Sequence, residues 1–135
     1  MIIYMSEVIC VTGRNLRTED FLEQLEQVLN AGVDRVILRE KDLSKEEYRK
    51  LAIEVLTLCR RYDTSCVLHS FCDVATELGE TKIHLPIQRL REMSVKEKQC
   101  FTTIGVSCHS AAEAVEAQKM GAAYLIAGHI FETDC

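Results

Sequence analysis

Two histidines of this sequence occupy positions where an imidazole could exchange protons with a bound ligand. His129 follows a predicted strand over residues 123–127 and comes directly after Gly128, which lets the backbone approach a ligand closely. His69 ends another predicted strand, over residues 65–69. Because histidine has a reference pKa of about 6.5, it takes up and releases protons near neutral pH. We interpret His129 as the candidate general acid/base and His69 as a candidate substrate contact or second proton carrier, with a structural role as the alternative for each.

Four further polar side chains are candidates for binding a substrate. The Arg39 guanidinium could clamp a carboxylate through two parallel hydrogen bonds, or it could pair with Glu40 instead. Lys41, in the following loop, is a second cationic candidate, with a solvated side chain as the alternative. The hydroxyls of Ser107 and Thr133, which lie at or beyond predicted strand ends, are candidate hydrogen-bond donors to a ligand.

Short apolar runs alternate with longer helical patterns, and these elements must position the candidate residues. Strands are predicted over residues 8–12, 35–39, 65–69, 82–85, 103–107 and 123–127. Helices are predicted over residues 19–30, from the Ser44 cap through Cys59, over 73–78, over about 87–93 and from Ser110 to Gly121. The segment 96–99 mixes both charge signs and is predicted to be a solvated stretch.

This alternation indicates βαβ units and a parallel sheet, in an α/β fold. The pattern fits either an open doubly wound sheet or part of an eight-stranded barrel. The absence of a Gly-x-Gly-x-x-Gly motif after the first strand argues against a dinucleotide-binding fold.

Composition places the chain among ordinary globular proteins. It has 135 residues, a net charge of −5, 47% hydrophobic residues and seven cysteines without a Cys-x-x-Cys pair. We therefore expect a single domain over residues 1–135, with cysteines that are mostly small core residues in a reducing, cytoplasmic compartment. Interspersed charges argue against a nucleic-acid partner, and the short apolar runs argue against a membrane span. No signal peptide is evident at the start of the sequence.

Four segments resemble a known family, the thiamine phosphate synthase and TenI superfamily. They are residues 36–43 (VILREKDL), 78–85 (LGETKIHL), 104–110 (IGVSCHS) and 128–135 (GHIFETDC), the last of which is most similar to the TenI, or thiazole tautomerase, branch. The resemblance implies a (β/α)8 TIM barrel, present here as an incomplete barrel of about six βα units. It also places the active site at the carboxyl ends of the strands, where His129, Arg39 and Ser107 are expected.

Departures from the synthase pattern concern its metal. The resemblance implies two aspartates that hold Mg²⁺ and, through it, a pyrophosphate, but Ser70 and Arg89 stand at those two positions. Mg²⁺ prefers oxygen ligands, above all carboxylates, and a guanidinium repels it. We therefore expect no metal and no cofactor.

The resulting hypothesis is a thiazole tautomerase-like isomerase. It would aromatise a phosphorylated carboxythiazole intermediate of thiamine biosynthesis by proton transfer through His129. The alternatives are a thiamine phosphate synthase and a non-catalytic regulatory or binding protein of the thiamine pathway. The expected partners are a small phosphorylated thiazole substrate and a second copy of the chain, through a homo-oligomer or an association of exposed strand edges.

Overall fold

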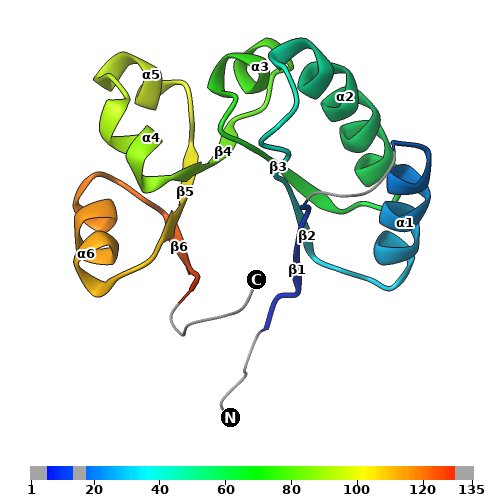
Figure 1. The fold of residues 1–135 in the computed structure, drawn as a ribbon, viewed down its shortest axis with the longest axis horizontal. Coiled ribbons are helices and arrows are strands. Elements are labelled where there is room, and N and C mark those ends of the chain that lie inside the picture. Colours follow the sequence, from blue (N-terminus) through cyan, green and yellow to red (C-terminus); the bar gives the residue numbers. More distant parts are fainter. Residues whose placement is uncertain (1–5, 14–17, 130–135) are drawn as a thin grey trace. The chain divides into compact units, whose positions relative to one another are not determined.

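The computed structural model describes residues 6–13 and 18–129. In chain order its elements are β1 (Ile9–Val11), α1 (Thr18–Asn30), β2 (Arg35–Leu38), α2 (Lys45–Arg61), β3 (Ser65–His69), α3 (Cys72–Glu77), β4 (Lys82–Pro86), α4 (Ile87–Glu92), α5 (Val95–Gln99), β5 (Thr103–Cys108), α6 (Ala111–Lys119) and β6 (Tyr124–Ala127) (Figure 1). The chain divides into two compact units, Met1–Val67 and Leu68–Cys135. The expectation of a single domain stays a prediction.

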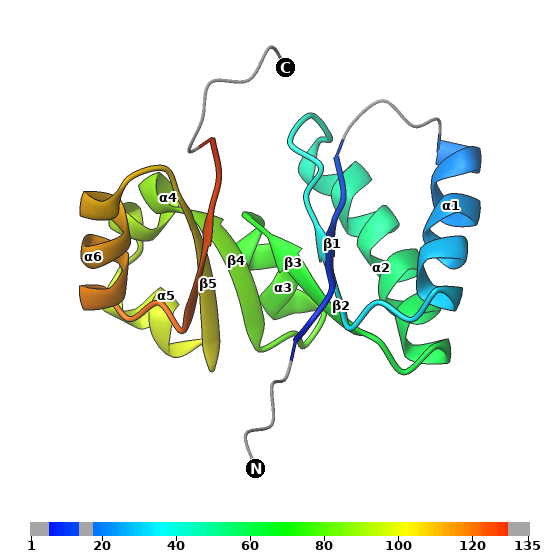
Figure 2. The same ribbon diagram turned by 90° about the horizontal axis from the view of Figure 1, so that it is seen from below.

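The first unit contains a pair of parallel strands and two helices. β1 pairs with β2 in a register that aligns Cys10 with Val36. The helices α1 and α2 lie beside each other, as the two views show (Figures 1 and 2). A buried hydroxyl ties helix to strand, because the Tyr48 hydroxyl donates to the carbonyl of Leu38 at 2.7 Å.

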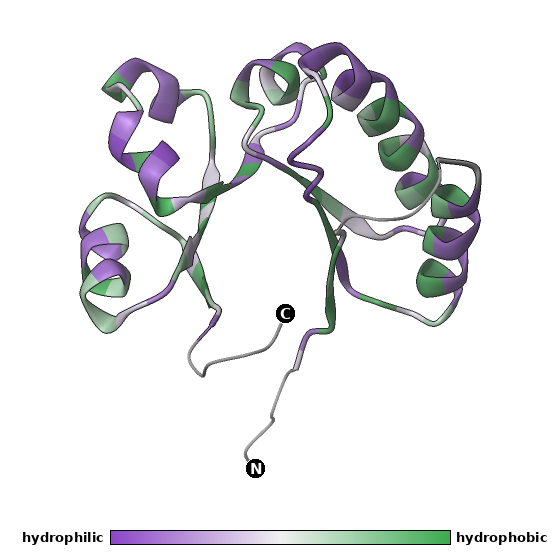
Figure 3. Cartoon of the chain, viewed as in Figure 1, coloured by the Kyte–Doolittle hydropathy of each residue, from purple (hydrophilic) through white to green (hydrophobic). Residues whose placement is uncertain are grey.

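Hydropathy explains how α2 packs in this unit. Hydrophobic and hydrophilic residues alternate along the helix with a helical period, whereas β1 and β2 are mainly hydrophobic (Figure 3). The buried face of α2 carries Tyr48, Ala52, Val55, Leu56, Leu58 and Cys59. Ser44 begins the helix with the predicted capping box, since its hydroxyl accepts from the Glu47 N–H while the Glu47 carboxylate accepts from the Ser44 N–H.

The second unit continues the pattern with four parallel strands. The end of β3 pairs with β4, β4 with β5, and β5 with β6. The helices α4, α5 and α6 lie on one side of the strands β4 to β6 (Figures 1 and 2). The predicted strands and helices are therefore confirmed, within about one residue at most strand ends.

The helix α5 is the element that the sequence analysis did not predict. Ser94 and Glu97 form a complete capping box at its start, and none of its residues is buried. The segment 96–99 is therefore solvated, as expected, but it is helical. Within the described part of the chain, no helix is both long and apolar enough to cross a membrane.

Candidate functional site at the carboxyl ends of the strands

A row of four residues crosses the sheet of the second unit. The strand register aligns His69 with His84, His84 with Gly105, and Gly105 with Tyr124. Because side chains alternate between the two faces of a strand, Ser107 lies on the same face as Gly105, one step nearer the carboxyl end. The sheet thus gathers two imidazoles, a phenol and an aliphatic hydroxyl from four strands on one face.

The imidazole of His84 is hydrogen-bonded at both ring nitrogens. Its Nε2 lies 2.7 Å from the Ser107 Oγ, and its Nδ1 lies 3.2 Å from the Tyr124 hydroxyl. The side chain is buried, and desolvation lowers the pKa of His84 to about 4. At neutral pH this ring is uncharged, so it donates through one nitrogen and accepts through the other.

Gly105 makes room for the bond between His84 and Tyr124. A Cβ at position 105 would lie 2.1 Å from Cζ and 2.3 Å from the hydroxyl of Tyr124. The phenol ring therefore occupies the space directly above this glycine and reaches across β5 to β4. Any larger residue at position 105 would displace the ring.

His69 extends the row as a buried, stacked ring. Its centroid lies 5.5 Å from that of His84, with an angle of 26° between the ring planes. Its Nδ1 lies 2.8 Å from the hydroxyl of Ser70, a residue with a positive φ of 67°. The packed alternative is therefore the one that the structure favours for His69, because the ring is only 4% exposed.

His129 lies just past the end of β6 and is exposed. It adopts a positive φ of 53°, and its ring centroid lies 5.7 Å from that of His109. His109 in turn places Nδ1 3.0 Å from the Gly128 carbonyl, while the Gly128 N–H donates to the Cys108 carbonyl. Two exposed imidazoles thus stand together where β5 and β6 end, a position at which a bound ligand can reach them.

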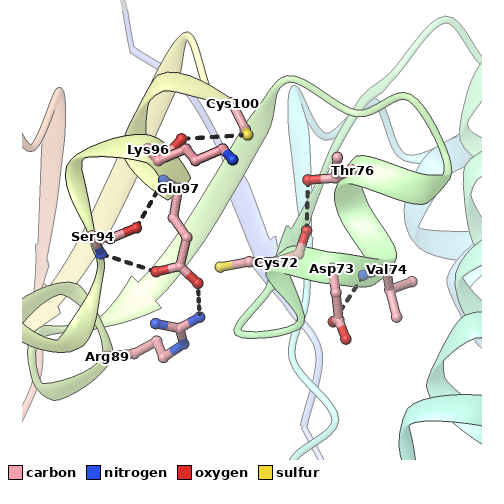
Figure 4. Close-up of polar contacts among 9 residues, drawn as sticks. All are labelled: Cys72, Asp73, Val74, Thr76, Arg89, Ser94, Lys96, Glu97 and Cys100. Atoms are coloured by element: carbon pink, nitrogen blue, oxygen red, sulfur yellow. Dashed lines mark hydrogen bonds and ion pairs between the residues drawn. The ribbon is translucent and has the colours of Figure 1, made fainter.

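A cavity of about 690 Å³ lies between α3 and the α4–α5 segment. Its lining includes Ser70 and Arg89, the two positions that depart from the synthase metal pattern. Arg89 pairs with Glu97 at 3.4 Å, and the thiol of Cys72 in α3 points toward this pair (Figure 4).

Charges in this cavity are arranged as an ion pair beside a buried thiol. The Ser94 N–H, followed by the Arg89 guanidinium, holds the pKa of the Glu97 carboxyl below its ordinary value. Burial raises the pKa of the Cys72 thiol. Because Ser70 has no carboxylate and Arg89 carries a positive charge, this pair does not fit a magnesium ion. Among the residues that the structure describes, no group of three or more His, Cys, Asp or Glu side chains could hold a metal ion.

The remaining predicted contacts lie elsewhere. Arg39 and Lys41 belong to the first unit, directly after β2; Arg39 is half-buried and Lys41 is exposed. The Arg39 backbone is held by Thr12, whose Oγ1 accepts from the Arg39 N–H at 2.9 Å. Thr133 lies outside the described residues.

His84, Gly105 and Tyr124 belong to the candidate site but were not among the predicted site residues. The predicted strand over residues 123–127 contains Tyr124 among apolar residues, and nothing in that pattern marks its hydroxyl. The available signal was Gly105, because a glycine inside a strand often marks a point where another group approaches closely.

In the second unit the parallel strands β3, β4, β5 and β6 are neighbours in chain order, without the reversal of strand order that marks a doubly wound sheet, and this order defines a protein of the (β/α)8 barrel class. The solved structure of a thiamine phosphate pyrophosphorylase from Pyrococcus furiosus matches 95% of this chain and 62% of its own, with a TM-score of 0.75 and 28% identity. The family model described as thiamine monophosphate synthase matches residues 8–135, so the chain belongs to that family.

Curated relatives carry the synthase name. The chain is 37% identical over 123 residues to a protein of Aquifex aeolicus named "Putative thiamine-phosphate synthase 2", covering 91% of this chain and 66% of the relative. It is 32% identical over 129 residues to the thiamine-phosphate synthase of Clostridium acetobutylicum, covering 91% and 59%. The chain therefore spans about three fifths of the length of such relatives. These names favour the synthase alternative over the tautomerase hypothesis.

Proposed function

We propose that this chain binds a phosphorylated thiazole in thiamine biosynthesis, and that its activity is that of a thiamine phosphate synthase. The names of the relatives support the activity. The observation that carries the binding proposal is the hydrogen-bonded pair of His84 and Ser107, which offers a ligand one hydroxyl held by a neutral imidazole. We expect the protein to act in the cytoplasm.

The chain's own residues supply binding and orientation in this proposal. Ser107 contacts an oxygen of the thiazole substrate, and Arg39 and Lys41 are the cationic candidates for its anionic groups. Ser70 and Arg89 do not fit the magnesium ion that the synthase resemblance implies, so pyrophosphate departure is not assigned to residues of this cavity.

The test is the formation of thiamine phosphate from the two synthase substrates, measured by chromatography with and without Mg²⁺. We expect product in the wild type and at least about a tenfold loss of kcat/KM in Ser107→Ala, because one hydrogen bond to a charged group is removed. A matched control is Ser6→Ala, at an exposed position ahead of β1. Absence of product under both conditions would contradict the synthase proposal.

A second candidate, thiazole tautomerase activity, is favoured by two observations. The metal positions hold Ser70 and Arg89, and His129 is exposed beside His109. In this reaction the imidazole of His129 removes a proton from one carbon of the phosphorylated carboxythiazole, and a proton is returned at another carbon, so that the substrate is isomerised without a change in composition.

Absorbance during incubation with the non-aromatic tautomer tests this candidate. We expect His129→Ala to slow aromatisation by about 10²- to 10⁴-fold, the usual contribution of a general acid/base. His69→Gln is the comparison, since that ring is buried. An unchanged rate in His129→Ala would remove His129 from the mechanism, and binding of thiazole phosphate without turnover in either assay would favour the non-catalytic alternative.

A further inference from the structure

The neutral imidazole of His84 carries its proton on either Nδ1 or Nε2, and its position in the sheet alone does not decide which. A neutral imidazole has one donor and one acceptor nitrogen. If Tyr124 donates to Nδ1, then Nε2–H donates to Ser107, and the serine proton is directed elsewhere. In the opposite tautomer, Nδ1–H donates to the phenol oxygen, and the Ser107 hydroxyl donates its hydrogen bond to Nε2.

Acidity decides between these two arrangements. A phenol, with a pKa of about 10, is a stronger donor and a weaker acceptor than an aliphatic hydroxyl. The favourable pairing therefore sets the Tyr124 O–H against Nδ1 and the more basic Ser107 oxygen against Nε2–H. The distances of 3.2 Å from Nδ1 to the Tyr124 hydroxyl and 2.7 Å from Nε2 to the Ser107 hydroxyl give each ring nitrogen one hydroxyl partner in either tautomer, so the choice between the tautomers rests on acidity.

The sheet enforces this geometry through its register. His84, Gly105 and Tyr124 are consecutive partners across β4, β5 and β6, and only a residue without a Cβ leaves room for the phenol between the outer two strands. The ring-to-ring distance of 5.6 Å between His84 and Tyr124 places the two side chains in contact over Gly105.

We propose that Tyr124 is a positioning residue that holds His84 as the Nε2–H tautomer, so that the Ser107 hydroxyl keeps its proton for an oxygen acceptor of the ligand. The acceptor is an anionic oxygen, from a phosphate or a carboxylate. The identity of that ligand rests on the function proposed above, whereas the tautomer does not. His84 acts through Ser107, and Tyr124 acts through His84.

The tautomer is measured directly by NMR of the full chain with ¹⁵N-labelled histidine at pH 7. We expect a pyridine-type Nδ1 and a pyrrole-type Nε2 for His84 in the wild type. In Tyr124→Phe, which keeps the aromatic ring and removes the hydroxyl, we expect both nitrogen signals to move toward intermediate values. Gly105→Ala is a second route to the same change, because the added Cβ displaces the phenol.

Tyr62→Phe is the matched control, since it removes a phenol hydroxyl that donates to Glu26 in the first unit. Its His84 signals are expected to equal those of the wild type. A wild-type spectrum with protonated Nδ1 overturns the proposal even if no variant folds, and so does a Tyr124→Phe spectrum identical to that of the wild type.

Titration with the phosphorylated thiazole separates this inference from the proposed function. We expect Tyr124→Phe to weaken binding about tenfold, and the double variant with Ser107→Ala to be no weaker than Ser107→Ala alone, because the two act on one hydrogen bond. Additive losses contradict the relay through His84. If the wild type shows the Nε2–H tautomer but binds no thiazole, the function fails while the positioning role stands.

Discussion

Among single residues, His84 makes the free energy of unfolding depend on pH, because its imidazole is buried. Its pKa is lowered to about 4 by desolvation, whereas the unfolded chain has the ordinary value of about 6.5. Between these two values the unfolded state binds a proton that the folded state does not bind. The contribution of this residue to the free energy of unfolding is therefore complete above pH 6.5 and is lost as the pH falls toward 4.

We predict that this window accounts for about 3 kcal/mol of acid destabilisation. Urea unfolding at pH 7.5 and at pH 4.5 measures it, with His84→Gln as the variant whose pH dependence becomes shallower. The control is His109→Gln, at an exposed histidine of the same unit. Equal pH dependence in the wild type and His84→Gln would show that the folded-state pKa of His84 is not lowered.

Substitutions of Ser70 and Arg89 test whether these two residues are the reason why the cavity does not fit Mg²⁺. Both line one cavity, so two carboxylates at these positions would face the same space. We predict that Mg²⁺ leaves the melting temperature of the wild type unchanged, and that it raises that of Ser70→Asp/Arg89→Asp by a few degrees, through ligand linkage.

The control for this prediction keeps the carboxylate at position 70 and moves the second carboxylate out of the cavity. Arg91 lies on the same helix but pairs with Glu116 at 2.6 Å, so Ser70→Asp/Arg91→Asp changes the same number of charges. An equal response of the wild type and of Ser70→Asp/Arg89→Asp to Mg²⁺ would show that the two introduced carboxylates do not bind the ion.

Among the helices, α5 is stabilised mainly by the hydrogen bonds of its first turn. Val95 is 73% exposed, so burial contributes little to this five-residue helix. The reciprocal bonds of Ser94 and Glu97 satisfy two N–H groups that would otherwise lack partners.

We predict that Ser94→Ala lowers the free energy of unfolding by about 1 kcal/mol, as loss of an N-cap does elsewhere. Chemical denaturation measures this value, and Ser6→Ala, at an exposed position outside any helix, is the control. A loss of similar size in both variants would contradict a specific role for the cap.

The comparison of α5 with α2 shows that hydrophobic periodicity predicts a helix only where the helix has a buried face. Elements with a buried stripe, such as α2, were predictable because hydrophobic periodicity reports packing. Ser94 and Glu97 have the spacing of a capping box, which is a signal for a helix start. The helix α5 was nevertheless not predicted, because its mixed-charge segment has no apolar face. The positions of Ser107 near the end of β5 and of His129 just past β6 were predictable from the strand pattern, and their roles stay predictions. The contact of Tyr124 with His84 was not predictable, because the two residues are 40 positions apart in the chain.

For the whole molecule, the exposed edge of the strand β6 is expected to affect self-association. In the second unit, β6 pairs with β5, and no further strand on its other side is found among the described residues. Leu125 of β6 is 38% exposed. A strand edge without a partner strand, together with an exposed apolar side chain, favours association with another chain.

We predict that the 135-residue chain self-associates with rising concentration, and that Leu125→Lys shifts it toward the monomer. Sedimentation velocity at several concentrations measures this shift. Val95→Lys, at an equally apolar but helical surface position, is the control. A wild type that stays monomeric over the whole range would exclude association through β6.

The order of strands and helices, the caps of α2 and α6 and the family were determined by the sequence itself, because propensity, capping and motif spacing are local properties of the chain. Only the tertiary structure decided that His84 is buried between a phenol and a serine, and that Ser70 and Arg89 share one cavity. These are consequences of strand register and helix packing, which join residues far apart in the chain, and no local pattern records which strands become neighbours.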